Sequence, residues 1–298
     1  MNYHSPVLLK TSVDALNIKE NGIYVDVTFG GGGHSKEILN RLGKNGKLFA
    51  FDQDPDALEN RIDDHRFVLI AENFRYITRF LKFYRIEKVD GILADLGVSS
   101  HQFDVAERGF STRFDADLDM RMDQKSTISA KKIINRYSEE KLANIFFLYG
   151  ELRNARVLAR TIVDARLNKK ITTSFELKEV LKLHLPKAKE HKILAQIFQA
   201  IRIEVNQELE VLKEFLEQTP ELLKEKGRLS VISYHSLEDR LVKRFIRTGE
   251  FNGDPEKDFY GNTNEPLKKV GKLIVPTSEE IKENNRARSA KLRIATLK

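Results

Sequence analysis

The sequence predicts a doubly wound α/β domain with a parallel sheet, interrupted by an inserted, all-helical subdomain. Two observations predict this fold class. Short runs of β-branched and aromatic residues alternate with helical patterns four times within residues 1–95, as they do in parallel sheets. Helical periodicity then continues without strand character over residues 126–189. We therefore expect a sheet domain built from residues 1–125 and 190–298, with residues 126–189 as the insertion.

The chain is organised around residues 23–35, which read IYVDVTFGGGGHS. The β-branched and aromatic first half predicts a buried strand. Four glycines at 30–33 end that strand, and His34 precedes a helix predicted over residues 36–42. Because glycine has no Cβ, the backbone of such a turn can approach a ligand closely at the N-terminus of the helix.

Acidic side chains follow two of the next three strands, which are predicted at residues 47–51, 67–70 and 89–94. Asp52 follows the first of them, Phe74 comes shortly after the second, and Asp95 closes the third. The carboxyl ends of parallel strands meet at one edge of a sheet, where ligands bind. A carboxylate at Asp52 can accept both hydroxyls of a ribose. The order of these elements therefore predicts one nucleoside-binding pocket.

The glycine turn alone leaves the identity of that nucleoside open. The dinucleotide fingerprint needs a third glycine where Ser35 stands, so a nicotinamide-dependent oxidoreductase is an alternative that matches only in part. A P-loop is excluded because no Gly-Lys-Ser/Thr closes the turn. A tight turn next to a surface acid is the alternative without function.

The rest of the chain returns to the sheet after a long helical stretch. Residues 96–122 read as an irregular loop, which makes them a candidate functional segment. The later elements are predicted as a long helix at 193–216, a strand at 228–233, a helix at 241–246, a mobile loop at 248–270, a helix capped by Thr277, and a strand at 292–297.

Composition limits the classes of function. The 298 residues carry a net charge of +7, with a slight excess of acids before residue 125 and of bases after it. This balance favours a polyanionic partner such as nucleic acid, although solubility alone would also explain it. The chain has no cysteine, which excludes disulfides and cysteine nucleophiles and fits a reducing, cytoplasmic location.

Other classes of site are not expected. No signal peptide and no apolar run of about 20 residues is present, so we expect no membrane association. The histidines are scattered along the chain rather than spaced as ligands, so we expect no metal.

Nine motifs in order carry a resemblance to a known family: HSPVLL, VTFGGGGHS, FDQDPDA, GILADLGVSSHQFD, ERGFS, LDMRMD, FQAIRIEVNQEL, SYHSLEDRLVKRF and RARSAKLR. They span nearly the whole chain. With them the sequence resembles the S-adenosylmethionine-dependent methyltransferases and, more narrowly, the ribosomal small-subunit methyltransferase H family, also called MraW. The resemblance implies a Rossmann-like class I methyltransferase sheet with an inserted all-helical subdomain. It also implies N4-methylation of a cytidine in the decoding region of small-subunit (16S) ribosomal RNA.

The resemblance also implies partners and site residues. The partner would be small-subunit ribosomal RNA or the small ribosomal subunit, and the oligomeric state, a dimer included, stays open. Carried over by position, the contacts to S-adenosylmethionine would be Gly32, Gly33 and His34 in the turn, Asp52 on the ribose, Phe74 against the adenine, and Asp95 and Gln102 near the methionine end.

The absence of cysteine agrees with this chemistry, because C5-methylation of cytosine needs a thiolate and N4-methylation does not. The amine is a poor nucleophile, so an acceptor aimed at its N–H groups would favour the transition state. Asp95 is the candidate for that acceptor, unless it only binds the cofactor. His235 is a second catalytic candidate, to contact the base or take its proton, unless it is an ordinary loop histidine. The base could stack on Phe103, Phe110 or Tyr234.

Two groups of cations read as phosphate-contacting faces or as solvated helix surfaces: Lys243, Arg244 and Arg247, and Arg286, Arg288 and Lys291. A ribosome-assembly factor that binds RNA without catalysis is the remaining alternative.

Overall fold

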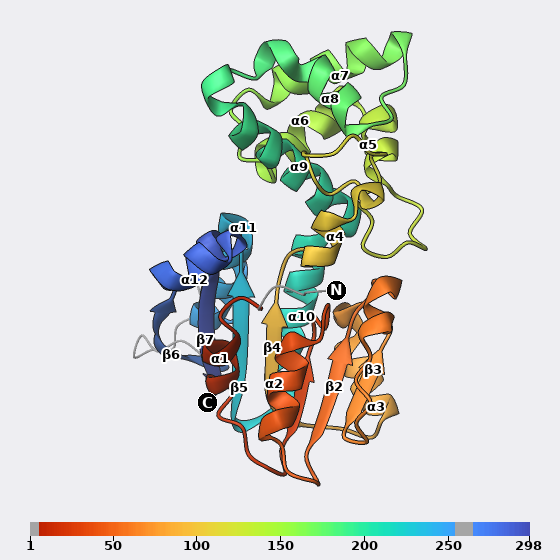
Figure 1. Ribbon diagram of the computed structural model, residues 1–298. Helices are drawn as coiled ribbons and strands as arrows, with labels where there is room; N and C mark the ends of the chain where they lie inside the picture. Colours follow the sequence, from red (N-terminus) through yellow and green to blue (C-terminus); the bar gives the residue numbers. More distant parts are fainter. Residues whose placement is uncertain (1–5, 254–264) are drawn as a thin grey trace. The chain divides into compact units, whose positions relative to one another are not determined.

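The computed structural model describes residues 6–253 and 265–298 and consists of two compact units (Figure 1). The sheet unit comprises Met1–Gly97 and Leu209–Lys298, and the helical unit comprises Val98–Glu208. The helical unit is longer than the expected insertion at 126–189. Packing explains the difference, because Leu118 from the irregular segment and Ile201 from the long helix both lie in the core of the helical unit.

The sheet unit holds seven strands in the order β3-β2-β1-β4-β5-β7-β6. The strands are β1 (Ile23–Asp26), β2 (Lys47–Phe51), β3 (Phe67–Ile70), β4 (Val89–Asp95), β5 (Leu223–Ser233), β6 (Leu267–Ile274) and β7 (Lys291–Leu297). The first five are parallel to their neighbours in this group. The sheet is therefore the predicted Rossmann-like methyltransferase sheet over most of its width.

One edge of the sheet corrects the expectation of a purely parallel arrangement. β7 runs antiparallel to both β5 and β6, so the sheet is mixed. β6 lies partly within residues 248–270, which were expected to form a loop. The strand was not predicted because three lysines and Gly271 interrupt the alternation of apolar and polar residues. Residues 254–264 of the expected loop lie outside the described residues.

Helices cover both faces of the sheet, as expected for a doubly wound domain. α3 (Ile77–Phe83), α10 (Glu208–Leu222) and α11 (Ser236–Thr248) pack on the face that carries Val25 and Ile92. α1 (Leu9–Asp14) and α2 (Gly33–Arg41) pack on the face that carries Tyr24 and Leu93. Successive residues of a strand point to opposite faces, which is why two buried layers arise from strands that read as continuous apolar runs.

The helix expected at 193–216 is two helices, and that expectation is wrong. α9 (Glu190–Asn206) ends at Gln207, whose φ of 51° is left-handed, and α10 begins at Glu208. The apolar stripe continues through the break, so periodicity alone could not reveal it. α10 after Glu208 belongs to the sheet unit, whereas α9 belongs to the helical unit.

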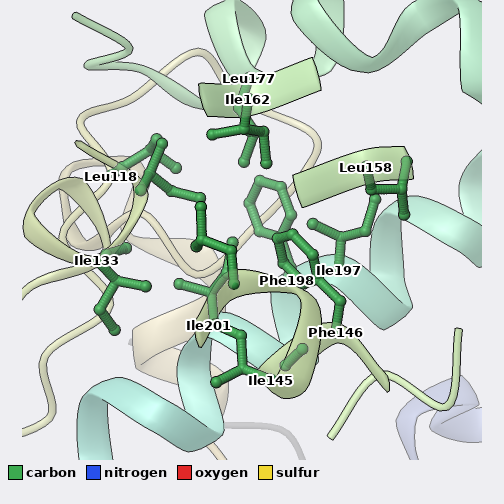
Figure 2. Close-up of a cluster of buried hydrophobic side chains, with 14 of the residues drawn as sticks. Leu118, Ile133, Ile145, Phe146, Leu158, Ile162, Leu177, Ile197, Phe198 and Ile201 are labelled. Carbon is green, nitrogen blue, oxygen red and sulfur yellow. The ribbon is translucent and has the colours of Figure 1, made fainter. Parts of the chain in front are cut away.

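The helical unit encloses its own apolar core (Figure 2). Its helices are α4 (Ser100–Asp104), α5 (Ala130–Arg136), α6 (Glu139–Leu148), α7 (Ala155–Asn168), α8 (Ser174–Leu181) and α9. Phe146, Ile162 and Ile197 from three of these helices are fully buried within it. The helical character expected between residues 126 and 189 is confirmed by α5 to α8. α4, in contrast, forms within a stretch that was expected to be a loop.

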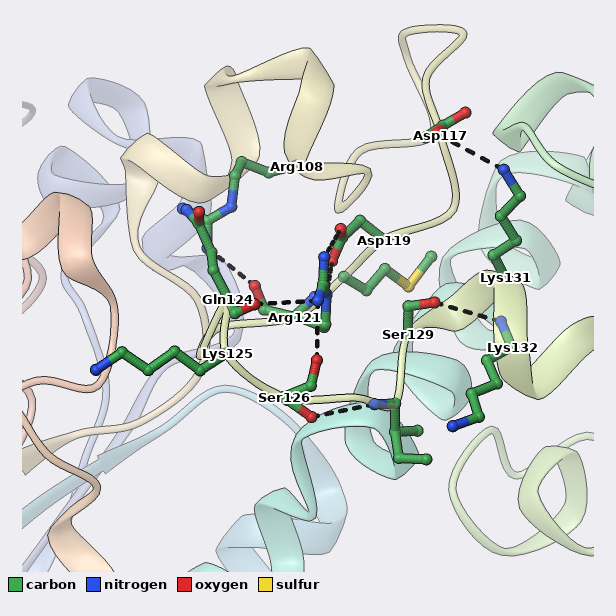
Figure 3. A network of polar contacts seen from close by, with 12 residues as sticks. Arg108, Asp117, Asp119, Arg121, Gln124, Lys125, Ser126, Ser129, Lys131 and Lys132 are labelled. Carbon is green, nitrogen blue, oxygen red and sulfur yellow. Dashed lines mark hydrogen bonds and ion pairs between the residues drawn. The ribbon is translucent and has the colours of Figure 1, made fainter.

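Arginines order the irregular segment that leads into α5 (Figure 3). Arg121 pairs with Asp119 at 2.7 Å and donates to the carbonyls of Gln124 and Ser126. Arg108, largely buried, donates to the carbonyl of Arg121 at 2.9 Å. Buried carbonyls need such donors, so this part of the helical unit is held by its own side chains.

Within the described residues, no helix has the length and apolarity to cross a membrane.

Candidate active site at the carboxyl ends of the strands

The glycine turn is tied to the end of β2 through Asp52. The amide of Gly30 donates to Oδ2 of Asp52 at 2.7 Å, and the amide of Asp54 donates to Oδ1 at 2.9 Å. Burial raises the pKa of Asp52 to about 6. Each carboxylate oxygen retains a further lone pair, so Asp52 can still accept hydroxyls of a sugar placed over the turn.

The turn ends where α2 begins. Its N-cap is Gly32, with a φ of 76°, and no side chain caps it among the described residues. Uncapped N–H groups at a helix N-terminus attract negative charge. Gly33 serves packing as well, because a Cβ there would lie 2.2 Å from Cγ of Pro6. Pro6 therefore packs directly against the turn.

Asp26, at the end of β1, accepts hydrogen bonds from residues on both sides of the glycine turn and was not identified from the sequence. It is fully buried, accepts from the hydroxyl of Ser35 at 2.7 Å, and accepts from the amide of Thr28 at 3.1 Å. Burial raises its pKa to about 6. A carboxylate within the apolar run IYVDVTF was a signal for such a residue, because buried acids are rare unless hydrogen-bonded.

Asp95 lies at the end of β4 with one oxygen engaged. Its amide donates to Oγ1 of Thr28 at 2.6 Å, and its Oδ1 accepts from the hydroxyl of Tyr234 at 2.8 Å. Its Oδ2 lies 3.7 Å from Nδ1 of His34, and the side chain is 21% exposed. Burial raises the pKa of Asp95 to about 7. The second oxygen is thus available to a ligand.

His34 is a neutral neighbour of that carboxylate. Burial lowers the pKa of His34 to about 4, so the imidazole carries no charge at pH 7. It therefore forms no ion pair with Asp95, and a cationic ligand that favours the ionised form of Asp95 meets no competing charge from His34. Burial also raises the pKa of Tyr234 well above its ordinary value, so its hydroxyl stays a proton donor.

His235 caps α11, and its ring faces Glu238. Its Nδ1 accepts from the amide of Glu238 at 3.4 Å, and its Nε2 lies 3.1 Å from Oε1 of the same residue. Oε2 of Glu238 in turn accepts from the amide of Tyr234 at 2.9 Å. The expected contact of His235 with a target base stays a prediction. What the structure shows is a capping box that fixes the turn carrying Tyr234.

The two remaining predicted cofactor contacts belong to different units. Phe74 follows β3 in the sheet unit, half-buried, with its ring edge-on to Phe215 at 5.3 Å between centroids. Gln102 belongs to the helical unit, where it completes a capping box with Ser99.

The three residues predicted to stack on the base are divided in the same way. Phe103 and Phe110 pack on the core of the helical unit. Tyr234 is the one that belongs to the sheet unit, where its hydroxyl contacts Asp95.

The sheet unit therefore brings together most of the site residues predicted from the sequence. Gly32, Gly33 and His34 are adjacent in the turn, and His34 lies next to Asp95. Asp52 binds the other end of the turn through the amide of Gly30. The donor set fits a nucleoside with a cationic centre. Asp52 offers acceptors for a ribose, the α2 terminus offers donors for a carboxylate, and Asp95 offers negative charge beside a neutral imidazole. These groups are polar, partly buried and convergent, as in ligand sites generally.

Comparisons with known proteins agree with this site. The model of the MraW methylase family matches residues 1–298. The ribosomal RNA small subunit methyltransferase H of Flavobacterium johnsoniae is 70% identical over 295 residues, which cover 99% of this chain and 98% of that protein. The protein of the same name from Christiangramia forsetii is 69% identical, with the same coverage. These matches favour a methylase over the oxidoreductase and the non-catalytic factor. The chain belongs to the MraW methylase family, and the resemblance of its motifs to that family is confirmed.

Proposed function

We propose that this protein transfers the methyl group of S-adenosylmethionine to the N4 amine of a cytidine in the decoding region of small-subunit ribosomal RNA. The observation that carries the proposal is Asp95, whose carboxyl closes β4 beside the glycine turn and keeps one oxygen for a ligand. Membership in the methylase family and the names of the relatives support the substrate class.

The cofactor contacts are proposed for the residues that the motifs designated. Gly32, Gly33 and His34 would line the turn, Asp52 would accept the ribose hydroxyls, and Phe74 would lie against the adenine. Asp95 and Gln102 would complete the site near the methionine end. When bound, S-adenosylmethionine supplies a methyl group on a cationic sulfur, and a positive charge nearby favours the carboxylate form of Asp95.

The amine is activated by orientation rather than by a covalent intermediate. The free oxygen of Asp95 accepts an N–H of the N4 amine and so favours the pyramidal nitrogen that forms as its lone pair bonds to the methyl carbon. The bond from that carbon to sulfur breaks, and its electron pair stays on sulfur. The amine then loses one proton, to Asp95 or to solvent. Tyr234 holds the carboxylate in place throughout through its hydrogen bond.

The substrate must present the edge of the cytosine, so the reacting nucleotide is single-stranded or flipped out of a helix. The partner is then small-subunit ribosomal RNA, free or within an assembling small subunit. That substrate places the reaction in the cytoplasm, in agreement with the lack of cysteine in the sequence.

The test is mass-spectrometric mapping of modified nucleosides. Purified protein is incubated with S-adenosylmethionine and with small subunits, or their RNA, from a strain that lacks the gene. We expect one N4-methylated cytidine in the decoding region, and none with Asp95→Ala protein that retains its circular dichroism spectrum. Methylation at C5 of a pyrimidine, or none at all, would contradict the proposal.

A further inference from the structure

α11, β6 and β7 form one edge of the sheet unit (Figure 1). Residues of these three elements line a basic cavity. Its volume is about 340 Å³, within the range of cavities that hold small ligands. Apolar residues from α11 and β6 contribute to its lining: Ile246, Leu267, Val270 and Leu273. Cations from the same two elements surround them: Lys243, Arg247, Lys268, Lys269 and Lys272.

A bulge in β6 helps to shape this cavity. Val270 pairs with Ile294 and Ile274 pairs with Leu292, so residues 271–273 stand opposite Arg293 alone. Gly271 allows the bulge, with a φ of 66° and nothing within 4 Å of a Cβ placed there. Bulges at sheet edges re-aim side chains. Here residues on both sides of Gly271 line the cavity.

The five cations have no partner acid within the described part of the chain. They are exposed, and none of them forms an ion pair with any residue in 6–253 or 265–298. The acid that lines the cavity, Glu265, already pairs with Lys298 at 2.6 Å. Arg293, in contrast, is engaged by Asp239 at 2.7 Å. Among residues 6–253 and 265–298, the cavity therefore presents positive charge without a partner acid around an apolar lining.

Two ordinary explanations account for only part of this pattern. Cations near the C-terminus of α11 complement the helix dipole, which explains Arg247 but not the lysines of β6. Lysines on an edge strand prevent aggregation, which explains Lys268 or Lys272 but not their gathering with Lys243 around one cavity.

We propose that this cavity binds the phosphate backbone of the RNA substrate, a short distance along the strand from the reacting cytidine. This inference rests on the proposed function, because it assumes an RNA substrate. Lysine binds phosphate as a point charge without reading the base, so the contact is independent of sequence. The apolar lining suits the ribose or base of a nucleotide whose phosphates lie against the surrounding lysines.

The position of the cavity on the sheet unit agrees with this role. α11 begins at Ser236, next to the turn that carries Tyr234, and Lys243 lies seven residues further on. With a rise of about 1.5 Å per residue, the cavity begins about 10 Å along the helix from that turn. A strand whose base reaches Asp95 can therefore extend over α11 towards β6.

The test compares two variants that each lose two positive charges. Lys243→Gln/Lys269→Gln removes one cation from α11 and one from β6. Lys44→Gln/Lys88→Gln is the matched control, because both of its lysines are exposed on the sheet unit, outside the cavity, and without an ion pair among the described residues. Fluorescence anisotropy with an RNA that spans the decoding region gives Kd from about 50 to about 200 mM KCl. Methyl transfer and titration with S-adenosylmethionine are measured alongside.

We expect the cavity variant to bind RNA about three- to tenfold more weakly and to lower the slope of log K against log salt by about 1 to 2. Its kcat at saturating RNA and its affinity for S-adenosylmethionine stay at the level of the control. If the wild-type protein transfers methyl groups but the cavity variant keeps the RNA affinity and the salt slope of the control, this inference is overturned and the proposed function is not. If, in addition, the cavity variant aggregates where the control does not, the inference is also overturned, and the lysines serve to protect the edge strand from aggregation. Absence of transfer by the wild-type protein would instead overturn the proposed function.

Discussion

The hydroxyl of Tyr234 donates a 2.8 Å hydrogen bond to Oδ1 of Asp95. This bond joins the end of β4 to the turn after β5 and occupies one oxygen of the carboxylate that we propose to orient the amine. The bond also counteracts the effect of burial on the pKa of Asp95, because a hydrogen-bond donor to the charged form lowers the pKa of an acid. The pH dependence of the reaction should therefore depend on Tyr234.

Tyr234→Phe should move the acid limb of activity to higher pH. Without the hydroxyl, the pKa of Asp95 rises further from its value of about 7, and less carboxylate is present at neutral pH. A hydrogen bond to a charged group contributes about 1.5–3 kcal/mol, so kcat/KM at pH 7 should fall about tenfold and recover in part at pH 9. The measurement is the pH profile of kcat/KM for S-adenosylmethionine, which reports the free enzyme. A uniform loss at all pH values would show that Tyr234 acts only on the fold.

Asp95→Asn should make the protein more stable than the wild type at high pH. The folded-state pKa of Asp95 is raised from 3.8 to about 7, so the folded state keeps a proton that the unfolded state gives up between those values. The corresponding stability is present below about pH 4 and is lost as pH rises through 7. Asparagine does not titrate and can still accept from Tyr234.

Urea unfolding of both proteins at pH 5 and pH 8 measures this effect. The loss of unfolding free energy between the two pH values should be smaller for Asp95→Asn, by about 1 kcal/mol or more. Asp26 and Asp52 also titrate late, but both are present in the two proteins. The difference therefore reports Asp95 together with its electrostatic coupling to Asp26. Equal losses in the two proteins would show that Asp95 is ionised in the folded state at pH 5.

Much of the sheet unit could be predicted because local patterns determine it. The run around β1, the glycine turn and the acids after β2 and β4 each carry their own signal, and the structure places them at one edge. Asp26 was overlooked because a single acid within a strand resembles a surface residue until its partners Ser35 and Thr28 are known. Contacts across the sheet, such as Tyr234 with Asp95, join residues 139 positions apart, and no local pattern encodes them.

The misassigned elements share a physical cause. The break at Gln207 depends on a left-handed backbone in a residue that ordinarily favours helices. β6 is an edge strand whose lysines face water, so its sequence lacks the alternation of apolar and polar residues that a half-buried strand shows. The extent of the helical unit follows from packing of Leu118 and Ile201, which lie far apart in the chain. In each case the local apolar pattern does not encode the feature that decides the structure.

Asp52→Ala should weaken binding of S-adenosylmethionine more than it slows the reaction. Asp52 accepts the amide of Gly30 and would accept the ribose hydroxyls, so its removal costs binding in both the ground and transition states. We expect Kd to rise about 10- to 100-fold, with kcat at saturating cofactor within about threefold of wild type. Isothermal titration and steady-state rates provide the two numbers. Glu59→Ala, an exposed acid on the same connection, is the matched control, and equal Kd values for the two variants would exclude Asp52 from the ribose contact.

His235→Asn separates capping from catalysis. Asparagine is as good an N-cap as any residue, whereas it cannot take a proton from the base. If His235 only caps α11, Asn should retain both melting temperature and kcat, while His235→Ala should lose about 1 kcal/mol of stability. If His235 acts as the base that the sequence suggested, both variants should lose kcat to the same degree. Thermal melts and the pH profile of kcat for the two proteins distinguish these outcomes.

Gly33→Ala should destabilise the turn through Pro6 rather than through its own backbone. The added Cβ would lie 2.2 Å from Cγ of Pro6, so the segment at Pro6 must move, at a cost of about 1–3 kcal/mol. Pro6→Ala removes that Cγ, and the double variant should recover at least about 1 kcal/mol of the loss. Chemical denaturation of the four proteins measures the coupling, and titration with S-adenosylmethionine shows whether affinity recovers with it. Stability that recovers while affinity does not would mean that the methyl group added at position 33 obstructs the cofactor itself, which would place the ligand directly on the turn.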